Sequence, residues 1–345
     1  MQRVNRRTFI ATTGAFAVAS PCLIRAAEKP RIRVGFLGAS HSHASEKFRI
    51  VSASTDFELL GVCEESEKVR EPLAQLGARF VSRADLLDRA EVVIVESAVR
   101  DHARDAKAAL EAGQHVHVEK PPAATMREGE DLVRLAREKN RLLQVGYMWR
   151  LQPGINRVIQ AAQKGWLGEV FLVRAQINTQ LDAKRRAEWA EFNGGSMFEL
   201  GCHLIDPVVR LLGKPARVTP HLQRRGGDNL ADNCVAIFEF AKAQAIITSS
   251  VLQPNAPSHR FLEILGTNGT ARVGPIEPPA LTLDLAKAAG PYKAGKQTIE
   301  LPMYRRYVAE FSELALAIRE RQPLSTSPDD ELRVHETLLR ACEMV

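Results

Sequence analysis

Short apolar runs alternate with amphipathic stretches between residues 31 and 146, and this alternation constrains the fold more than any other feature of the sequence. Five runs have the length and composition of strands, namely 32–37, 59–63, 92–95, 115–118 and 142–145. The stretches 44–54, 67–75, 101–112 and 127–139 have helical apolar spacing. Strand and helix units in this order build a parallel sheet covered by helices. We therefore predict an α/β Rossmann dinucleotide-binding domain over residues 31–150.

The pattern changes after residue 150 to consecutive strands, which is typical of a mostly antiparallel sheet. A helix is expected over 153–164, and β-rich runs follow at 169–176, 218–223, 234–240, 244–252 and 261–265. Helices are expected at 196–212, 304–321 and 328–345, and the Pro- and Gly-rich stretch 274–295 is expected to be a loop with little structure. Residues 151–345 are thus predicted to form an α+β domain with a large open sheet, which suits a chain of 345 residues.

Residues 1–27 differ from the rest of the chain and have the order of a twin-arginine signal peptide. Arg6 and Arg7 precede the apolar run 11–24, and small residues follow. The run is too short and broken to span a bilayer, so no stable membrane insertion is expected, although an anchor or a lipid attached at Cys22 is the alternative. We expect the twin-arginine machinery to export the folded protein to the periplasm or another extracytoplasmic compartment.

The net charge argues against a nucleic-acid-binding protein, and the cysteine spacing argues against a cysteine-based metal site. Residues 1–27 contain four arginines and no acid, so their removal lowers the net charge from +6 to +2. Because no basic stripe remains, we expect no nucleic-acid partner. The sequence has no CxxC pattern, and buried free thiols are the simplest interpretation of its four scattered cysteines beyond residue 27, Cys63, Cys202, Cys234 and Cys342.

The first predicted strand runs into a degenerate dinucleotide fingerprint. Gly38 can form the tight turn, and Ala39 follows it. Ser40 and His43 stand where the second and third glycines usually fall. By itself this match does not distinguish a dinucleotide site from a purely structural turn.

Glu64 favours the dinucleotide interpretation because it ends the second predicted strand, where an acid can bind the adenosine ribose. An acid there repels a 2′-phosphate, so NAD is expected rather than NADP, although a solvated carboxylate is the alternative role. His41 and His43 either approach the phosphates or substrate or cap the next helix. Two histidines at this spacing suit a metal ion, but no third ligand is evident nearby in the sequence, so no metal site is predicted.

Two further segments carry residues suited to acid–base chemistry. Lys120 ends the fourth predicted strand beside two prolines, at the edge of the sheet where ligands bind. Glu199, His203 and Asp206 have a spacing that places all three on one helix face. A buried histidine flanked by acids is a tuned proton acceptor for alcohol oxidation. A helix cap and a satisfied core histidine are the alternative.

These residues resemble the Gfo/Idh/MocA oxidoreductases, the family of glucose-fructose oxidoreductase and inositol dehydrogenase. The resemblance rests on Glu119, Lys120 and Pro121 and on the segment from Gly194 to Asp206, and it extends over nearly the full chain. It implies that Lys120 polarises the substrate hydroxyl and that His203 is the base. Glu199 replaces the usual aspartate and is expected to hold Lys120 or His203 in place.

The resemblance also implies a cofactor between the domains and a C-terminal sheet that mediates homodimers or homotetramers. Ser97 begins a Ser-Ala-Val turn that departs from the family's usual Thr-Pro-Asn type. The remaining residues that it assigns to the cofactor are Ser97, His102, Glu119, Lys120 and Pro121. Those that it assigns to the substrate are Tyr147, Arg150 and Asp206, with His203. Trp149 and Trp189 can also line a carbohydrate pocket or belong to the core.

We therefore predict an exported NAD(P)-dependent oxidoreductase that acts on a sugar or polyol hydroxyl. Free NAD is expected to be scarce outside the inner membrane, so the cofactor is expected to be tightly held through the catalytic cycle. Two alternatives remain open. One is an NAD-dependent glycosidase or lyase that uses transient oxidation, and the other is a non-catalytic sugar or dinucleotide sensor.

Overall fold

The structure, a computed structural model, describes residues 30–345, so the predicted signal peptide over residues 1–27 lies outside the described residues. Within the described range, no helix is both long enough and apolar enough to cross a lipid bilayer. Two sheets organise residues 31–345, one of five strands and one of eight. The four cysteines in this range are free thiols; Cys202, Cys234 and Cys342 are buried, as the sequence predicts, whereas Cys63 is only partly buried.

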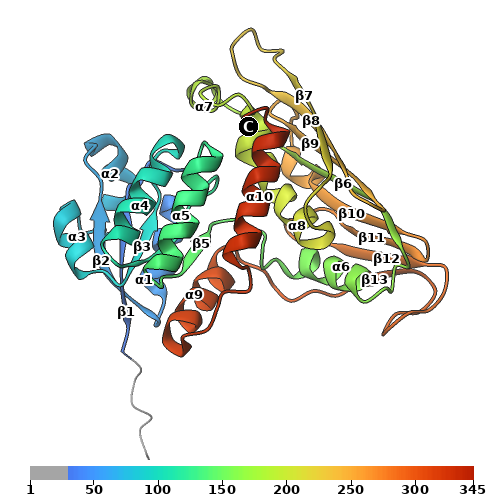
Figure 1. Cartoon of the computed structure of the whole chain (residues 1–345), viewed down its shortest axis with the longest axis horizontal. Coiled ribbons are helices and arrows are strands. Elements are labelled where there is room, and N and C mark those ends of the chain that lie inside the picture. The colour runs from blue at the N-terminus through green and yellow to red at the C-terminus, as the bar shows by residue number, and fades with distance from the viewer. Residues whose placement is uncertain (1–29) are drawn as a thin grey trace, which may run out of the picture. The chain divides into compact units, whose positions relative to one another are not determined.

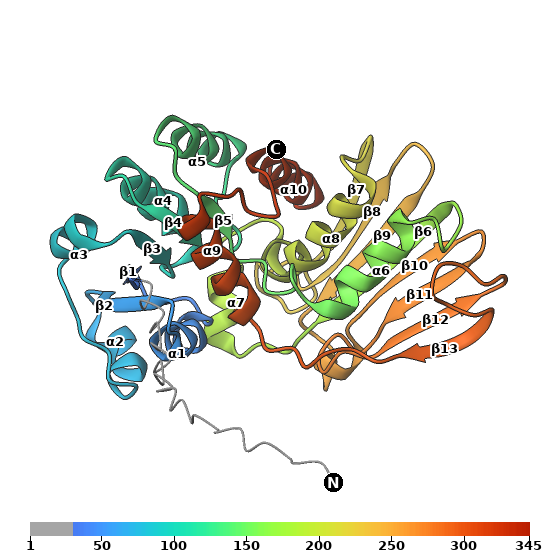
Figure 2. The same ribbon diagram turned by 90° about the horizontal axis from the view of Figure 1, so that it is seen from below.

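The first sheet is wholly parallel, with the strand order β2-β1-β3-β4-β5. Helices α4 and α5 cover one face, and α1 and α2 cover the other (Figure 2). This arrangement confirms the predicted Rossmann-like domain. Its strands are β1 Ile32–Leu37, β2 Phe57–Cys63, β3 Val92–Val95, β4 His115–Val118 and β5 Leu143–Val145. Its helices are α1 Ala44–Ala53, α2 Glu67–Ala74, α3 Arg83–Arg89, α4 His102–Glu111 and α5 Met126–Glu138. The sequence analysis missed only α3.

The strands of this sheet end level with one another, which gathers the residues that follow them. Leu37 of β1 pairs with Cys63 of β2 and with Val95 of β3, and Val95 pairs with Val118 of β4. The chain leaves β1 for β2 on one side and later returns to β3 on the other, so the strand order reverses beside β1. Ligands bind at such a reversal, outside the carboxyl ends of the strands.

The second sheet is mostly antiparallel, with the order β13-β12-β11-β10-β6-β9-β8-β7 and one parallel pair, β6 with β9. Helices α6, Pro153–Gln163, and α8, Cys202–Leu212, lie on one face of this sheet (Figure 1). This confirms the predicted α+β domain with a large, mostly antiparallel sheet. The strands are β6 Val170–Asn178, β7 Arg217–Gln223, β8 Asn233–Glu239, β9 Gln244–Ser250, β10 Phe261–Gly266, β11 Gly269–Val273, β12 Leu281–Leu285 and β13 Gly295–Ile299.

The expectation of a loop with little structure over 274–295 is wrong, because β12 lies within it and β13 begins at its end. Leu281, Leu283 and Leu285 are buried and alternate with polar residues, which is the period of a half-buried strand. Proline and glycine content outweighed that short alternation in the sequence analysis. The helix α7, Ala183–Trp189, was also not predicted.

The two C-terminal helices, α9 Val308–Glu320 and α10 Pro328–Ala341, pack against elements of the Rossmann domain. The ring of Phe311 meets Phe57 of β2 edge-on at 6.2 Å between centroids. Gln144 of β5 donates a hydrogen bond to the backbone oxygen of Glu310, at 3.1 Å. The C-terminal helix α9 therefore contributes to the core of the first domain, although it follows the second domain in sequence.

The close approach of Gly195 to Ala231, at the start of the segment that carries Glu199, can be tested by substitution. Gly195 has φ +45°, and a Cβ there would lie 2.5 Å from the carbonyl oxygen of Ala231. We expect Gly195→Ala to lower the free energy of unfolding by about 2–4 kcal/mol, because it adds a clash to the cost of a left-handed backbone. Gly113, which follows α4, has φ +89° but no atom within 4 Å of such a Cβ.

The matched control Gly113→Ala is therefore expected to cost only about 1–2 kcal/mol, the backbone contribution alone. Urea unfolding of both variants measures the difference. Equal losses of stability in the two variants would contradict the close approach of Gly195 to Ala231.

Candidate active site

A cavity of about 510 Å³ opens at the carboxyl edge of the parallel sheet. The loop that follows β1 contributes residues 40–43, the loop that follows β3 contributes residues 98–100, and Lys120 follows β4. From the second domain, Glu199, Leu200 and His203 complete the wall together with residues of α7, including Trp189. The fold thus brings the predicted acid–base residues and the predicted dinucleotide loop to one cavity.

The turn after β1 has the geometry that a dinucleotide requires. Gly38 has φ +78°, and a Cβ there would lie 2.5 Å from the Cα of Ser97, so only glycine fits. The next residue, Ala39, donates its backbone N–H to Glu64 at 3.0 Å. Helix α1 begins immediately after the loop without a side-chain cap. A tight glycine turn, an acid after β2 and an uncapped helix end together fit a bound dinucleotide.

Lys120 is held at the cavity by the second domain. Its Nζ donates a hydrogen bond to the backbone oxygen of Glu199 at 3.0 Å and lies 3.6 Å from the Glu199 carboxylate. Burial alone would lower the pKa of this ammonium group, but the attractions of its neighbours, chiefly Glu199 together with Glu119, outweigh burial in sum and raise the pKa above its ordinary value. Lys120 therefore stays charged across the neutral range.

His203 is only 1% exposed, and its Nδ1 has no hydrogen-bond partner among the described residues. The ring of Trp149 lies 5.7 Å from the imidazole, between centroids. Burial lowers the pKa of His203 well below its ordinary value, and the positive charge of Lys120 lowers it further. The imidazole is therefore neutral at neutral pH, which is the state that accepts a proton.

The expectation that acids flank His203 is wrong. Glu199 contacts Lys120, while Asp206 accepts hydrogen bonds from Arg150 at 2.7 and 3.1 Å. A π-helical turn over Met197–Gly201 precedes α8, so the residues across it do not keep the α-helical spacing on which the prediction relied. The pKa of His203 is consequently set by burial and by the charge of Lys120, not by Glu199 or Asp206.

Three residues that the resemblance assigned to the substrate lie outside the cavity wall. Arg150 is buried between Asp206 and Glu331, and Tyr147 is buried beside it, with the guanidinium 4.8 Å from the ring centroid. None of Arg150, Asp206 and Tyr147 lines the cavity, whereas His203 does. In this structure Arg150 and its two acids form a buried ion cluster.

Three predicted cofactor residues shape the turn that carries Lys120. The imidazole of His102 lies 2.8 Å from the backbone oxygen of Pro121 through Nδ1 and 3.1 Å from that of Ser97 through Nε2. A neutral ring donates only one of these hydrogen bonds. The contacts connect the loop after β3 to the loop after β4. Ser97, His102 and Pro121 thus hold the wall without lining it.

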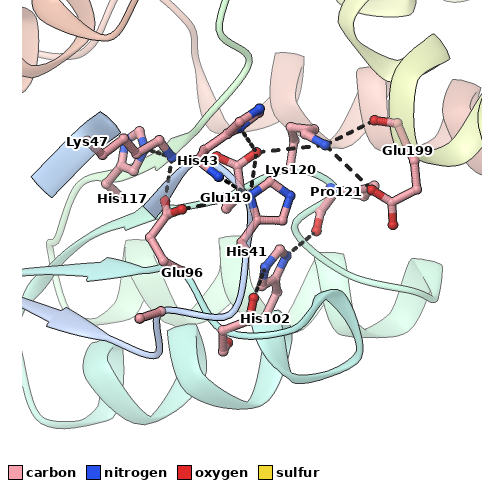
Figure 3. A network of polar contacts seen from close by, with 12 residues as sticks. His41, His43, Lys47, Glu96, His102, His117, Glu119, Lys120, Pro121 and Glu199 are labelled. Carbon is pink, nitrogen blue, oxygen red and sulfur yellow. Dashed lines mark hydrogen bonds and ion pairs between the residues drawn. The ribbon is translucent and has the colours of Figure 1, made fainter. Parts of the chain in front are cut away.

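Behind this wall lies a buried ionic network that the sequence analysis missed (Figure 3). Lys47 of α1 is fully buried, and its Nζ donates hydrogen bonds to Oε1 of Glu96 and Oε2 of Glu119. The same Nζ lies 2.9 Å from Nε2 of His117, whose Nδ1 lies 2.8 Å from the side chain of Gln144. The network therefore connects α1 to the adjacent strands β3, β4 and β5.

One ammonium group serves two buried carboxylates, so the two acids titrate differently. Burial raises the pKa of Glu96 to about 8, against the opposing charge of Lys47. Burial also acts to raise the pKa of Glu119, but Lys47 and the two nearby histidines outweigh it, and the pKa lies well below its ordinary value. Burial alone would lower the pKa of Lys47, yet the two carboxylates raise it. Glu119 and Lys47 are therefore both charged at neutral pH.

The sequence does contain signals for this network. Lys47 occupies the apolar face of α1, between the buried residues Ala44, Phe48 and Val51. Glu96 directly follows the fully buried strand β3, as Glu119 follows β4. A lysine in an apolar stripe and acids that end neighbouring parallel strands are expected to meet. This reasoning needs the strand order, which the sequence alone does not establish.

Two family models match the chain. The description "Oxidoreductase family, NAD-binding Rossmann fold" matches residues 32–147, and "GFO/IDH/MocA C-terminal domain" matches residues 155–272. Among curated proteins, a scyllo-inositol 2-dehydrogenase (NADP+) of Bacillus subtilis is 27% identical over 273 residues, which is 73% of this chain and 76% of the relative.

Solved structures share the fold over most of the chain. A UDP-N-acetylglucosamine 3-dehydrogenase from Acidithiobacillus ferrooxidans has a TM-score of 0.79 at 21% identity and covers 92% of this chain and 98% of its own. A protein from gentamicin A biosynthesis, solved in complex with NAD, has a TM-score of 0.77 at 23% identity and covers 92% and 95%. At these identities the likeness establishes the fold.

Removal of Lys47 tests the buried network. We expect Lys47→Met to lower the free energy of unfolding at pH 8 by about 3–5 kcal/mol, because Glu96 and Glu119 are left buried without a cation. Both carboxylates then have pKa values above those of the unfolded chain, so the folded state binds more protons and the loss grows as the pH rises. Denaturant unfolding at pH 5.5 and pH 8 measures the trend.

The control Lys107→Met removes an exposed lysine, which lies 3.9 Å from Glu111, and is expected to change stability by less than about 0.5 kcal/mol. If Lys47→Met lowers the free energy of unfolding only slightly at both pH values, water reaches the carboxylates, which would contradict a buried network.

Proposed function

The chain belongs to the Gfo/Idh/MocA family of NAD(P)-dependent oxidoreductases, and on that premise we propose that its cavity oxidises one hydroxyl of a carbohydrate or polyol. The proposal rests mainly on the observation that a charged lysine, Lys120, and a neutral, buried histidine, His203, line the same cavity. A nicotinamide dinucleotide, when bound, supplies the hydride acceptor. The chain's own residues then have to bind the hydroxyl, orient it and remove its proton.

Lys120 positions and polarises the hydroxyl oxygen. One of its three protons is directed to the backbone oxygen of Glu199, which fixes the ammonium group at the wall. The remaining protons are available for a substrate oxygen, and the positive charge stabilises negative charge that develops there. The Glu199 carboxylate keeps the lysine protonated, so Glu199 acts through Lys120 rather than on the substrate.

His203 accepts the hydroxyl proton. Its Nδ1 has no partner among the described residues, and the lowered pKa keeps the ring neutral. The imidazolium formed by proton transfer is disfavoured by burial and by Lys120, so the proton is expected to leave quickly. Removing such a general base typically lowers the rate by about 10²–10⁴-fold.

The dinucleotide is proposed to bind along the loop that follows β1, in contact with Gly38, Ala39, Ser40 and His43. Glu64 stands at the turn through its hydrogen bond with the N–H of Ala39 and is proposed to bind the ribose. Its negative charge favours NAD over NADP, whereas the similar inositol dehydrogenase of Bacillus subtilis is named for NADP+. Retention of the cofactor through the cycle is part of the same proposal.

We also propose export and self-association. Arg6 and Arg7 before the apolar run support a twin-arginine signal and an extracytoplasmic location. The face of the large sheet opposite α6 and α8 supports a homodimer or homotetramer, because cross-strand pairs such as Ile237 with Ile246 lie there only partly buried. Apolar side chains left on a sheet face are typical of an interface.

Substitution at the two cavity residues tests the assignment. We expect His203→Ala and Lys120→Met to lower kcat for sugar or polyol oxidation by about 10²-fold or more. Tryptophan fluorescence quenching should show that both variants still bind the nucleotide. His221→Ala, which changes an exposed histidine of β7, is the matched control and should keep full activity. A His203→Ala enzyme with wild-type kcat would refute the role of the base.

The pH profile gives a second, independent test. The base acts in its neutral form, so kcat/KM falls when the pH drops through the pKa of His203. Because burial lowers that pKa well below 6.5, we expect the acid limb of the profile to lie well below pH 6.5. Initial rates of nicotinamide reduction between pH 4.5 and 8 measure it. An acid limb centred at or above pH 6.5 would contradict a desolvated His203.

A further inference from the structure

Three side chains with metal-binding atoms converge beside the cavity. His41 and His43 belong to the loop after β1, and Glu119 follows β4, 76 residues further along the chain than His43. One potential ligand atom from each of the three residues lies within 4.8 Å of those of the other two. The sequence analysis found no third ligand near the two histidines, and the fold supplies one from another strand.

The two carboxylates of the buried network face this cluster in a specific way (Figure 3). Each gives one oxygen to Lys47 and turns the other toward His41. Nδ1 of His41 lies 3.8 Å from Oε2 of Glu96 and 3.9 Å from Oε1 of Glu119, and Nδ1 of His43 lies 3.1 Å from the same oxygen of Glu119. Separations of 3.8–3.9 Å are too long for hydrogen bonds.

Such separations are close to those between ligands that share one metal ion. With zinc–ligand bonds of about 2.0–2.1 Å, tetrahedral ligand atoms lie about 3.4 Å apart.

An unpartnered carboxylate oxygen provides an independent indication of a missing cation. Oε2 of Glu96 is buried and has no hydrogen-bond partner among the residues that the structure describes. It is directed at His41, not at Lys47. A buried carboxylate oxygen without a partner is costly, and a cation bound beside His41 would satisfy it.

We propose that His41, His43 and Glu119 bind one divalent transition metal ion, zinc by preference, with Glu96 as a supporting carboxylate. Two imidazoles and one carboxylate are a ligand set that proteins use for zinc sites with an open position. Both histidines line the cavity, so the open position faces the same space as Lys120 and His203. This site goes beyond the proposed oxidation, and its metal affinity is measurable without turnover.

The charges around the site indicate what the open position would hold. Even with Glu96, Glu119 and Glu199 all ionised, a divalent ion together with Lys47 and Lys120 leaves one positive charge in excess. The fourth ligand is therefore an anionic or ionisable oxygen, such as a water molecule with a lowered pKa or an oxygen of the substrate.

Zinc titration tests the proposal directly. The protein is purified without an affinity tag and dialysed against a chelator, and Zn²⁺ alone is titrated against a chromophoric competitor. We expect one tight site per chain. His41→Ala and His43→Ala should weaken binding by at least about 100-fold, and Glu96→Gln by about 10–100-fold. The control His221→Ala, which changes an exposed histidine, should bind as the wild type does.

Cobalt substitution separates ligand loss from misfolding. In His43→Cys a thiolate replaces the imidazole, so the variant should retain one Co²⁺ and gain a sulfur-to-cobalt charge-transfer band absent from the wild type. A urea unfolding midpoint and a far-ultraviolet circular dichroism spectrum that match those of the wild type show that the fold of this variant is intact.

The proposal is overturned if the wild type has no Zn²⁺ site tighter than the competitor detects, or if His41→Ala and His43→Ala bind Zn²⁺ as the wild type does. Neither outcome affects the assignment of Lys120 and His203, which the kcat measurements test separately.

Discussion

The pairing of one buried ammonium with two buried carboxylates is the interaction on which the rest of the site depends. Lys47 comes from the first helix, and Glu96 and Glu119 come from the ends of neighbouring parallel strands. Because charges are costly to bury without partners, the three elements have one arrangement that satisfies them. That arrangement fixes the loop with His41 and His43 on one side and the turn with Lys120 on the other.

The cavity in front of this network places a charged ammonium group and a neutral imidazole side by side. Lys120 remains an ammonium group because the Glu199 carboxylate attracts it, while His203 remains neutral because it is buried near that same positive charge. The second domain supplies both Glu199 and His203, and the first supplies Lys120. The proposed acid–base chemistry therefore needs the two domains in contact, and α9 contributes to that contact by packing against the Rossmann strands β2 and β5.

Sequence periodicity was sufficient for the Rossmann strands because parallel strands buried on both faces, such as 92–95, are continuous apolar runs. It was insufficient for Leu281–Leu285, where a short alternation stood among prolines. Lys120 and His203 were found through their motifs, but the partners of His203 were not, since the π-helical turn before α8 changes the register. Lys47 was missed because its burial depends on acids 49 and 72 residues away.

The most direct test of this account is the nucleotide content of the folded protein, purified without added nucleotide and then denatured. Assay of the supernatant for NAD(H) and NADP(H) identifies the cofactor and its occupancy. The account predicts near-stoichiometric NAD(H), retained on the loop that begins at Gly38 and ends at His43. A protein that releases no nucleotide and also fails to bind added NAD or NADP would contradict the dinucleotide site, and with it the proposed oxidation.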